Sequence, residues 1–300
     1  MNRSFRLHFL HGRLGLGLLA GLLAGTFRAE AAADSALREQ VTALFGQHQW
    51  AEAQALLEQA VAAAPDNAEA YFYLGQCQLS RGDAKTAVLS FEKATTLAPA
   101  NSEYVRLLGD SYGLTAGKAG VFAKLGWAKK CKAAYEKSVA LDPTNITARW
   151  SVMDYCRQAP ALFGGGIDGA YVQAAEIKKL DPVRGRRAYA IVYTTDKKYS
   201  EAFAVYEDVL KETPDDYEVL YQLGKLADTT GLELERGLAA LRKCLTLPST
   251  DSRGYVPAQW RIGNILAQKG DQAGARIAYD TALKLNPKFT EAIASLKKLN

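Results

Sequence analysis

The sequence predicts an all-α solenoid of about seven antiparallel helix pairs, followed by a C-terminal capping helix. The first observation behind this prediction is a period, because seven of the nine prolines follow one another at intervals of 32 to 44 residues. The second is a repeated spacing of small and apolar residues. It runs through Gly75, Ala87, Phe91, Ala94 and Pro99, and the same steps lead from Gly263 through Ala275, Tyr279 and Ala282 to Pro287.

Each repeat is expected to be two helices that cross where small residues meet, with Gly75 on the first helix against Ala87 on the second. A large side chain at either place would push the helices apart. The apolar residues at helical spacing form faces that one pair cannot bury alone, so neighbouring pairs must stack. Proline then ends the second helix of each pair.

These motifs resemble the tetratricopeptide repeat family, most clearly in the run YFYLGQCQLSRGDAKTAVLSFEKATTLAPAN at residues 71–101. The resemblance extends over residues 34–289, and residues 290–299 form the expected capping helix. It implies a right-handed superhelix whose first helices line a concave groove. It also implies that this groove binds peptides or protein segments, usually without catalysis.

Two repeats are longer than the period allows. Ten extra residues fall around 115–120, where helix-compatible neighbours predict that both helices of the pair are lengthened. Five more residues predict a loop at 159–166. Both insertions, at 113–127 and 159–166, should emerge on the same edge of the array. Their apolar residues are expected either to form a small satellite core or to dock a partner. These residues are Phe122, Trp127, Leu162 and Phe163.

The first 33 residues have the pattern of a secretory signal peptide, because arginines precede an uncharged run of 14 residues at 14–27 and then a stretch rich in alanine. This run is shorter than the roughly 20 residues that span a bilayer. We therefore expect cleavage after Ala31 or Ala33, a mature domain at 34–300 without a stable membrane span, and a periplasmic or secreted location. In an oxidising compartment a disulfide between Cys131 and Cys156 is one open possibility.

Composition excludes several classes of function. With 48% hydrophobic and 23% charged residues the chain is globular, and after the leading segment 33 basic residues face 31 acidic ones. Nucleic acid is therefore not an expected partner. Only one of the three histidines, His48, lies beyond the leading segment, so we expect no metal site, no cofactor and no histidine-based catalysis.

The first helix of each repeat should present three positions to the groove, namely three residues before, one after and four after its small crossing residue. Rigid aromatic residues among polar ones are typical of binding surfaces. The alternative for Trp150 and Trp260 is packing between repeats. The predicted groove residues are Arg38, Phe45, Phe72, Gln76, Arg106, Asp110, Trp150, Asp154, Arg157, Arg187, Tyr221, Lys225, Trp260 and Asn264, and the same positions also include Ile191, Thr194 and Asp228.

The expected function is a non-catalytic scaffold that holds a protein or peptide of the bacterial cell envelope. One subclass of the resembled family grips a terminal carboxylate with a lysine or arginine followed by an asparagine on the first helix. This pattern is absent, because Arg106 is followed by Asp110 and Arg187 by Ile191 where asparagine would stand. Two alternatives stay open, a polysaccharide-binding or export accessory protein, and a glycan-acting enzyme that uses Asp110 and Asp154. Against the enzyme, Arg106 and Arg157 are placed to form ion pairs with these two carboxylates.

Overall fold

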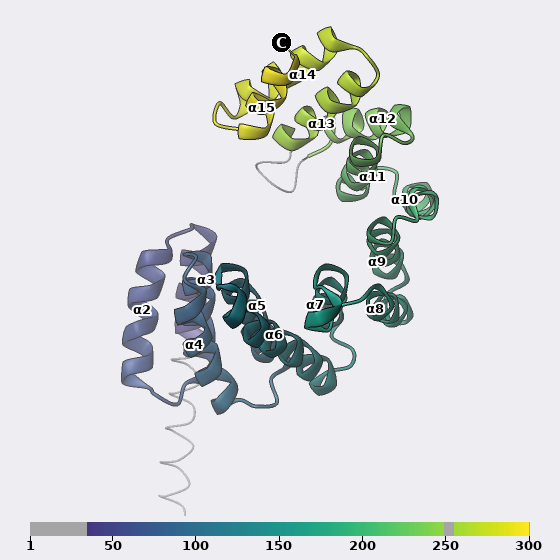
Figure 1. Ribbon diagram of the computed structural model, residues 1–300. Helices are drawn as coiled ribbons and strands as arrows, with labels where there is room; N and C mark the ends of the chain where they lie inside the picture. Colours follow the sequence, from purple (N-terminus) through teal and green to yellow (C-terminus); the bar gives the residue numbers. More distant parts are fainter. Residues whose placement is uncertain (1–34, 249–254, 300) are drawn as a thin grey trace, which may run out of the picture. The chain divides into compact units, whose positions relative to one another are not determined.

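The computed structural model describes residues 35–248 and 255–299, and the regular elements in these ranges are helices (Figure 1). The predicted all-α class with pairwise helix packing is confirmed. The signal peptide predicted for residues 1–33 lies outside the described residues, as do residues 249–254.

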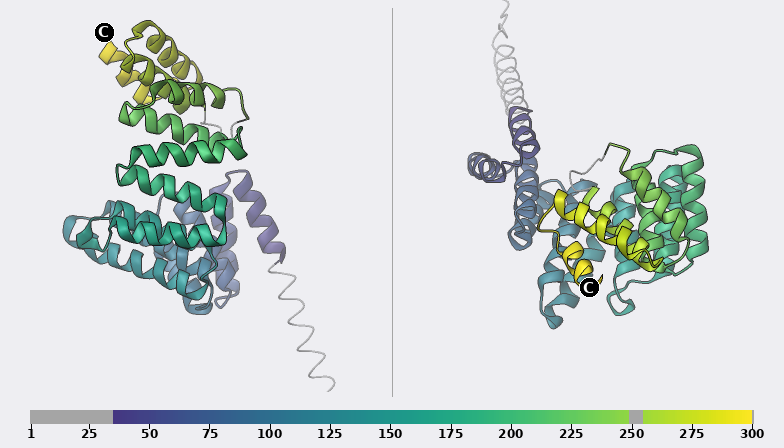
Figure 2. Two further views of the ribbon diagram at one scale, coloured as in Figure 1. Left: turned by 90° about the vertical axis from the view of Figure 1, so that its right-hand side faces the viewer. Right: turned by 90° about the horizontal axis from the view of Figure 1, so that it is seen from above.

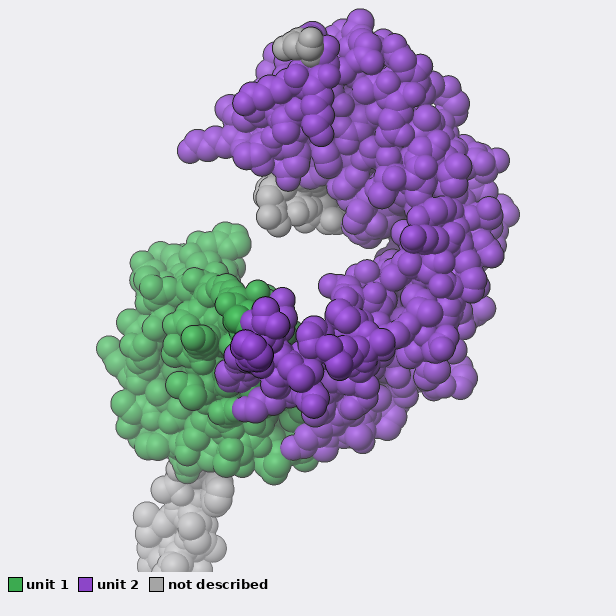
Figure 3. Space-filling model, in the orientation of Figure 1, with its two compact units in different colours: residues 1–120 green, residues 121–300 purple. Residues whose placement is uncertain are grey.

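The chain divides into two compact units, Met1–Gly120 and Val121–Asn300, which we call unit 1 and unit 2 (Figure 3). Unit 1 contains a helix at 35–46, α2 (Trp50–Ala63), α3 (Ala68–Ser80), α4 (Ala84–Leu97) and α5 (Ser102–Lys118). Unit 2 contains α6 (Val121–Leu141), α7 (Ile146–Gln158), the 3₁₀ turn η1 (Ala161–Phe163), α8 (Ile167–Leu180), α9 (Pro182–Thr195), α10 (Tyr199–Glu212), α11 (Tyr217–Thr230), α12 (Leu234–Cys244), α13 (Tyr255–Gln268), α14 (Gln272–Leu285) and α15 (Thr290–Leu299). Within unit 2 the helices stack in the order of the sequence (Figure 2).

The boundaries between repeats are fixed by short capping signals. Pro99 follows the end of α4, and Asn101 then accepts hydrogen bonds from the backbone N–H groups of Glu103 and Tyr104 at the start of α5. The side chains of Asn67, Asn145 and Asp216 cap α3, α7 and α11 in the same way. One proline departs from the prediction that proline ends the second helix, because Pro182 begins α9 directly after its cap Asp181.

The close approach of paired helices depends on a glycine, and the large side chain that fills the space beside it lies one turn beyond the small residue of the second helix. A Cβ atom on Gly75 would lie 2.7 Å from the ring of Phe91, four residues beyond Ala87. The same offset recurs in unit 2, where Leu241 fills the space beside Gly224 and Tyr279 fills the space beside Gly263. Each glycine is therefore the socket for a large side chain. The expected meeting of two small residues is also found at one crossing, where a Cβ atom on Gly237 would lie 3.6 Å from Cα of Gly224.

Adding a methyl group to such a socket should destabilise the protein. In Gly224→Ala the new Cβ would lie 2.3 Å from Cγ of Leu241, and we expect a loss of about 1–3 kcal/mol in the free energy of unfolding. The matched control is Gly126→Ala in α6, where no atom lies within 4 Å of the added carbon and a gain of about 0.5–1 kcal/mol is expected. Urea unfolding followed by helix content measures both. Equal changes in the free energy of unfolding of the two variants would contradict the interpretation of Gly224 as the socket for Leu241.

The two insertions have the local structures predicted for them. The helices α5 and α6 have 17 and 21 residues, against 13 and 14 in α3 and α4. Residues 159–166 form a loop that contains only the turn η1. This loop is held by Tyr155, whose hydroxyl lies 3.1 Å from the carbonyl oxygen of Ala128 and 2.7 Å from that of Phe163.

The satellite core expected between the insertions is not formed. Phe122 is 99% exposed and Leu162 is 79% exposed, whereas Trp127 and Phe163 are half-buried. The reason is the direction in which α6 packs. Its buried residues Ala128, Cys131, Ala134 and Ser138 lie on the opposite side of the helix from Phe122.

The capping helix α15 is confirmed, and it contributes the buried Ala292 to the large apolar core of unit 2. The four cysteines are buried, and the structure contains no disulfide among the described residues. Cys156 instead packs against Gly169, where an added Cβ would lie 2.8 Å from its sulfur atom. The possible bridge between Cys131 and Cys156 is therefore not present.

Candidate functional site

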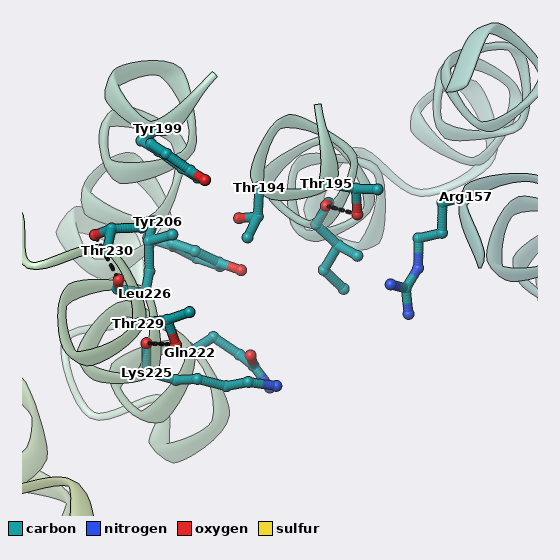
Figure 4. Close-up of a pocket in the computed structure, with 11 residues that line it drawn as sticks. Arg157, Thr194, Thr195, Tyr199, Tyr206, Gln222, Lys225, Leu226, Thr229 and Thr230 are labelled. Carbon is teal, nitrogen blue, oxygen red and sulfur yellow. Dashed lines mark hydrogen bonds between the residues drawn. The ribbon is translucent and has the colours of Figure 1, made fainter. Parts of the chain in front are cut away.

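A pocket with a volume of about 280 Å³ opens in unit 2 between the first helices of successive pairs (Figure 4). Helix α7 contributes Arg157, and α9 contributes Ile191, Thr194 and Thr195. Helix α11 contributes Gln222, Lys225, Leu226, Thr229 and Thr230. The second helix α10 reaches the pocket with Tyr199 and Tyr206. The lining therefore combines two cations with many hydroxyl groups, and it includes no carboxylate.

The threonine hydroxyls are oriented by their own helices. Thr195 donates to the carbonyl oxygen of Ile191 at 3.0 Å, and Thr229 donates to that of Lys225 at 2.8 Å. Thr194 and Thr230 form equivalent bonds to the carbonyl oxygens four residues before them. Because each hydroxyl proton is used within its helix, the oxygen lone pairs face outward as acceptors.

Tyr206 forms a buried part of the wall, with 4% of its surface exposed, and its hydroxyl points toward Thr194 (Figure 4). Burial raises the pKa of Tyr206 to about 12, so the hydroxyl stays protonated and neutral at physiological pH. It can donate a hydrogen bond but cannot serve as a base there.

The two cations approach the same space from different helices (Figure 4). Arg157 donates from Nε to a carboxylate oxygen of Asp154 at 2.6 Å, which confirms the predicted ion pair and leaves its terminal nitrogens for other partners. No described carboxylate forms an ion pair with Lys225. Desolvation, followed by the charges of Arg261 and Arg157, lowers the pKa of Lys225, with Glu218 opposing. An anion bound here would relieve the repulsion between these cations.

The structure brings together two of the predicted groove residues at this pocket, Arg157 and Lys225, with Ile191 and Thr194 from the same set of positions. The predicted residues of unit 1 have local partners instead. Arg38 forms an ion pair with Glu69, and Phe45 packs on Trp50. Phe72 stacks on Tyr104, Gln76 is half-buried in α3, and Arg106 bridges Glu103 and Asp110.

Of the other predicted residues of unit 2, Trp260 packs between repeats, which was the alternative to a place in the groove. Its ring meets Phe289 edge to face at 5.9 Å, and its Nε1 donates to Oγ of Ser295 at 3.0 Å. It therefore packs the capping helix α15 onto α13. Trp150 is half-buried against the core that includes Met153.

The remaining predicted residues belong to polar contacts between helices. Arg187 forms an ion pair with Asp216. Asn264 donates to Asp228, which also accepts from Arg261, and the guanidinium of Arg261 lies over the ring of Tyr221.

The contacts of Asp110 and Asp154 argue against the alternative of a glycan-acting enzyme. Asp110, in unit 1, accepts from Arg106 at 2.8 Å, and Asp154, in unit 2, accepts from Arg157 at 2.6 Å. Each carboxylate is thus engaged in an ion pair with an arginine of its own helix, an arrangement that does not suit a general acid.

Several lining residues were missed by the reasoning from sequence. Thr195 and Thr229 lie one helical turn beyond Ile191 and Lys225, so extending the predicted stripe by four residues would have found them. Tyr199 and Tyr206 lie on a second helix, and the rule that only first helices face the groove excluded them. These two tyrosines reach the pocket because α10 packs beside α9 and α11.

Within the described ranges, no cluster of three or more histidine, cysteine, aspartate or glutamate side chains is arranged to hold a metal ion. The described helices also include none with both the length and the apolar character that crossing a bilayer requires.

Comparison with known proteins agrees with this architecture of stacked helix pairs. Profiles of the tetratricopeptide repeat match residues 38–102, 117–145 and 256–289. These three segments are similar to tetratricopeptide repeats, and proteins built from this repeat are usually non-catalytic binding scaffolds. A search of curated protein sequences found no match.

Several solved structures superimpose on most of the chain. A protein of this family from Parabacteroides merdae has a TM-score of 0.64 at 19% identity, over 88% of this chain and 96% of its own. A thermophilic member from Thermus thermophilus has a TM-score of 0.52 at 19% identity, over 63% and 95%. The pilF protein of Pseudomonas aeruginosa has a TM-score of 0.52 at 16% identity, over 77% and 97%. At these identities the likeness concerns the fold alone.

Proposed function

We propose that this protein is a non-catalytic scaffold that holds an extended segment of a protein partner in the pocket of unit 2, with an acidic side chain of that segment between Arg157 and Lys225. The observation that carries the proposal is the lining, which offers two cations and no carboxylate. An acidic side chain would complete the hydrogen bonds of the guanidinium and give Lys225 a counter-ion.

The rest of the lining suits a peptide. The outward lone pairs of Thr195 and Thr229 can accept from backbone N–H groups, and Gln222 and the tyrosine hydroxyls add further polar contacts around Ile191. No histidine, cysteine or carboxylate lines the pocket. The site therefore lacks the paired acid and base that hydrolysis of a bound glycan or peptide requires.

The test is selection from a displayed library of random peptides of about ten residues, which span about 33 Å when extended. Peptides that bind the native chain should be enriched in aspartate or glutamate. Lys225→Glu and Arg157→Glu should each weaken the selected peptides at least about tenfold, because each places a negative charge where the ligand carries one. The control is Lys211→Glu in α10, whose side chain is 75% exposed and pairs only with Asp208 among the described residues.

The affinity for an acidic peptide should also depend on pH. Because desolvation and neighbouring cations lower the pKa of Lys225 below its usual 10.5, this lysine loses its charge at a lower pH than an exposed lysine would. Affinity should therefore be constant near neutral pH and fall as the pH rises toward that lowered pKa. The affinity of one selected peptide, measured over a range of pH, tests this expectation. Selection of neutral peptides or of neutral oligosaccharides would refute the proposal.

We further propose that the protein acts in the cell envelope after export. The support is the arginine-led apolar run at 14–27, which is followed by a stretch rich in alanine. Mass spectrometry of the protein recovered from its host should find a new N-terminus at Ala32 or Asp34. Recovery of the chain with its intact leading segment would overturn this proposal.

A further inference from the structure

The start of α6 exposes two large apolar side chains at adjacent positions. Val121 is 82% exposed and Phe122 is 99% exposed, so neither is covered by the packing of unit 2. We call Val121 and Phe122 the apolar tip. Single apolar residues on a surface need no explanation, but a phenylalanine exposed almost completely beside an exposed valine is unusual.

The exposed face of α6 that begins at the apolar tip is flat and basic. Phe122, Gly126, Lys129, Ala133 and Lys137 recur at intervals of three or four residues, and all five are exposed. Only the small residues Gly126 and Ala133 separate Phe122, Lys129 and Lys137 along this row.

Charge is distributed unevenly along the same helix. From Val121 to Tyr135 there are four lysines and no acidic residue, although the chain after its leading segment is nearly neutral. The next acid, Glu136, is engaged by Lys132 at 3.6 Å. Lys130 is exposed and lies 5.0 Å from the ring of the half-buried Trp127. The exposed surface around the apolar tip is therefore positively charged.

We propose that the apolar tip and the basic face of α6 dock unit 2 on an anionic lipid bilayer. A lipid surface offers anionic headgroups in a plane and an apolar interior directly below them. The flat row of lysines fits the plane, and the protruding Phe122 fits the interior without a pocket of matching shape. A protein partner would need such a pocket together with a patch of acids. Exposed apolar side chains combined with several lysines provide the two contributions that stable peripheral binding requires.

Sedimentation of the full chain with vesicles tests this surface. One set of vesicles contains phosphatidylcholine alone, and the other contains about one third phosphatidylglycerol. The native chain should bind the anionic vesicles more strongly. Phe122→Ser should lower that binding about tenfold. The double variant Lys129→Gln with Lys130→Gln should lower it about 25-fold, or about fivefold for each charge. The leading segment is the same in every chain, so differences between variants report on α6.

The matched control is Ile277→Ser in α14, which removes an apolar side chain that is 67% exposed at a site with charges of both signs nearby. It should leave binding unchanged. A thiol-reactive fluorophore on Val121→Cys should shift to shorter wavelength with anionic vesicles, whereas the same label on Ile277→Cys should not. The four natural cysteines are buried and do not compete for the label.

Binding that is unchanged by both the Phe122 and the lysine substitutions would overturn the proposal. So would a self-association of the native chain that Phe122→Ser abolishes without any preference for anionic vesicles, because the surface would then join two copies. The peptide site is tested separately, because Lys225→Glu changes peptide binding and does not involve α6.

Discussion

Replacing Arg261 with alanine should lower the free energy of unfolding of unit 2 by about 3–5 kcal/mol, the cost of leaving a buried charge without its partner. Arg261 and Asp228 form an ion pair at 2.6 Å, and only 14% and 7% of their side chains are exposed. The guanidinium also lies between the rings of Trp260 and Tyr221 and donates to the hydroxyl of Tyr221 at 3.1 Å. Because these contacts join α11 to α13, the loss should loosen the C-terminal pairs first.

A double variant separates the charge from the packing. Arg261→Met with Asp228→Leu removes both charges and keeps most of the volume, so it should be much less destabilised than Arg261→Ala. Urea unfolding, followed by circular dichroism, gives both values. If Arg261→Ala lowers the free energy of unfolding by less than about 1 kcal/mol, the ion pair between Arg261 and Asp228 behaves as a solvent-exposed one.

The second large effect is expected at Phe91 in unit 1. Its side chain is fully buried and its ring fills the space beside Gly75, with a further edge-to-face contact to Phe72 at 6.0 Å. Phe91→Ala should cost about 3–5 kcal/mol, because the socket left open cannot collapse against a glycine that has no side chain.

The control for Phe91 lies two residues earlier on the same helix. Leu89 is 66% exposed, and Leu89→Ala should change the free energy of unfolding by no more than about 0.5 kcal/mol. In a stacked array each pair supports its neighbours, so Phe91→Ala should also broaden the unfolding transition. Equal losses in the two variants would show that the ring of Phe91 is not what holds α3 and α4 together.

The fold was predictable because its signals are local and repeated. The intervals between prolines, the small residue on each first helix and the apolar spacing on each second helix determine where the pairs begin and end. The lengthening of α5 and α6 and the loop at 159–166 followed from residue counts within single repeats. These features do not depend on how one pair sits against the next.

The features that could not be predicted depend on neighbours outside the repeat. Trp260 packs against Phe289 and Ser295 because α15 lies beside α13, which no pattern within α13 indicates. Phe122 was expected either to join a satellite core or to dock a partner, and it is exposed because α6 buries its opposite side. Within the pocket, Arg157 and Lys225 lie at positions derived from the repeat, whereas Tyr206 reaches it from a second helix and required the structure.

The central claim is that an acidic side chain of a bound segment lies beside Lys225, and a charge-exchange cycle tests it most directly. One peptide selected on the native chain is measured with native and Lys225→Glu protein, each with the peptide's acidic residue present or changed to lysine. The account predicts that either single change weakens binding at least about tenfold and that the two changes together restore most of the affinity. If the doubly changed pair binds no better than the singly changed ones, the peptide does not place its charge at Lys225 and the account is wrong.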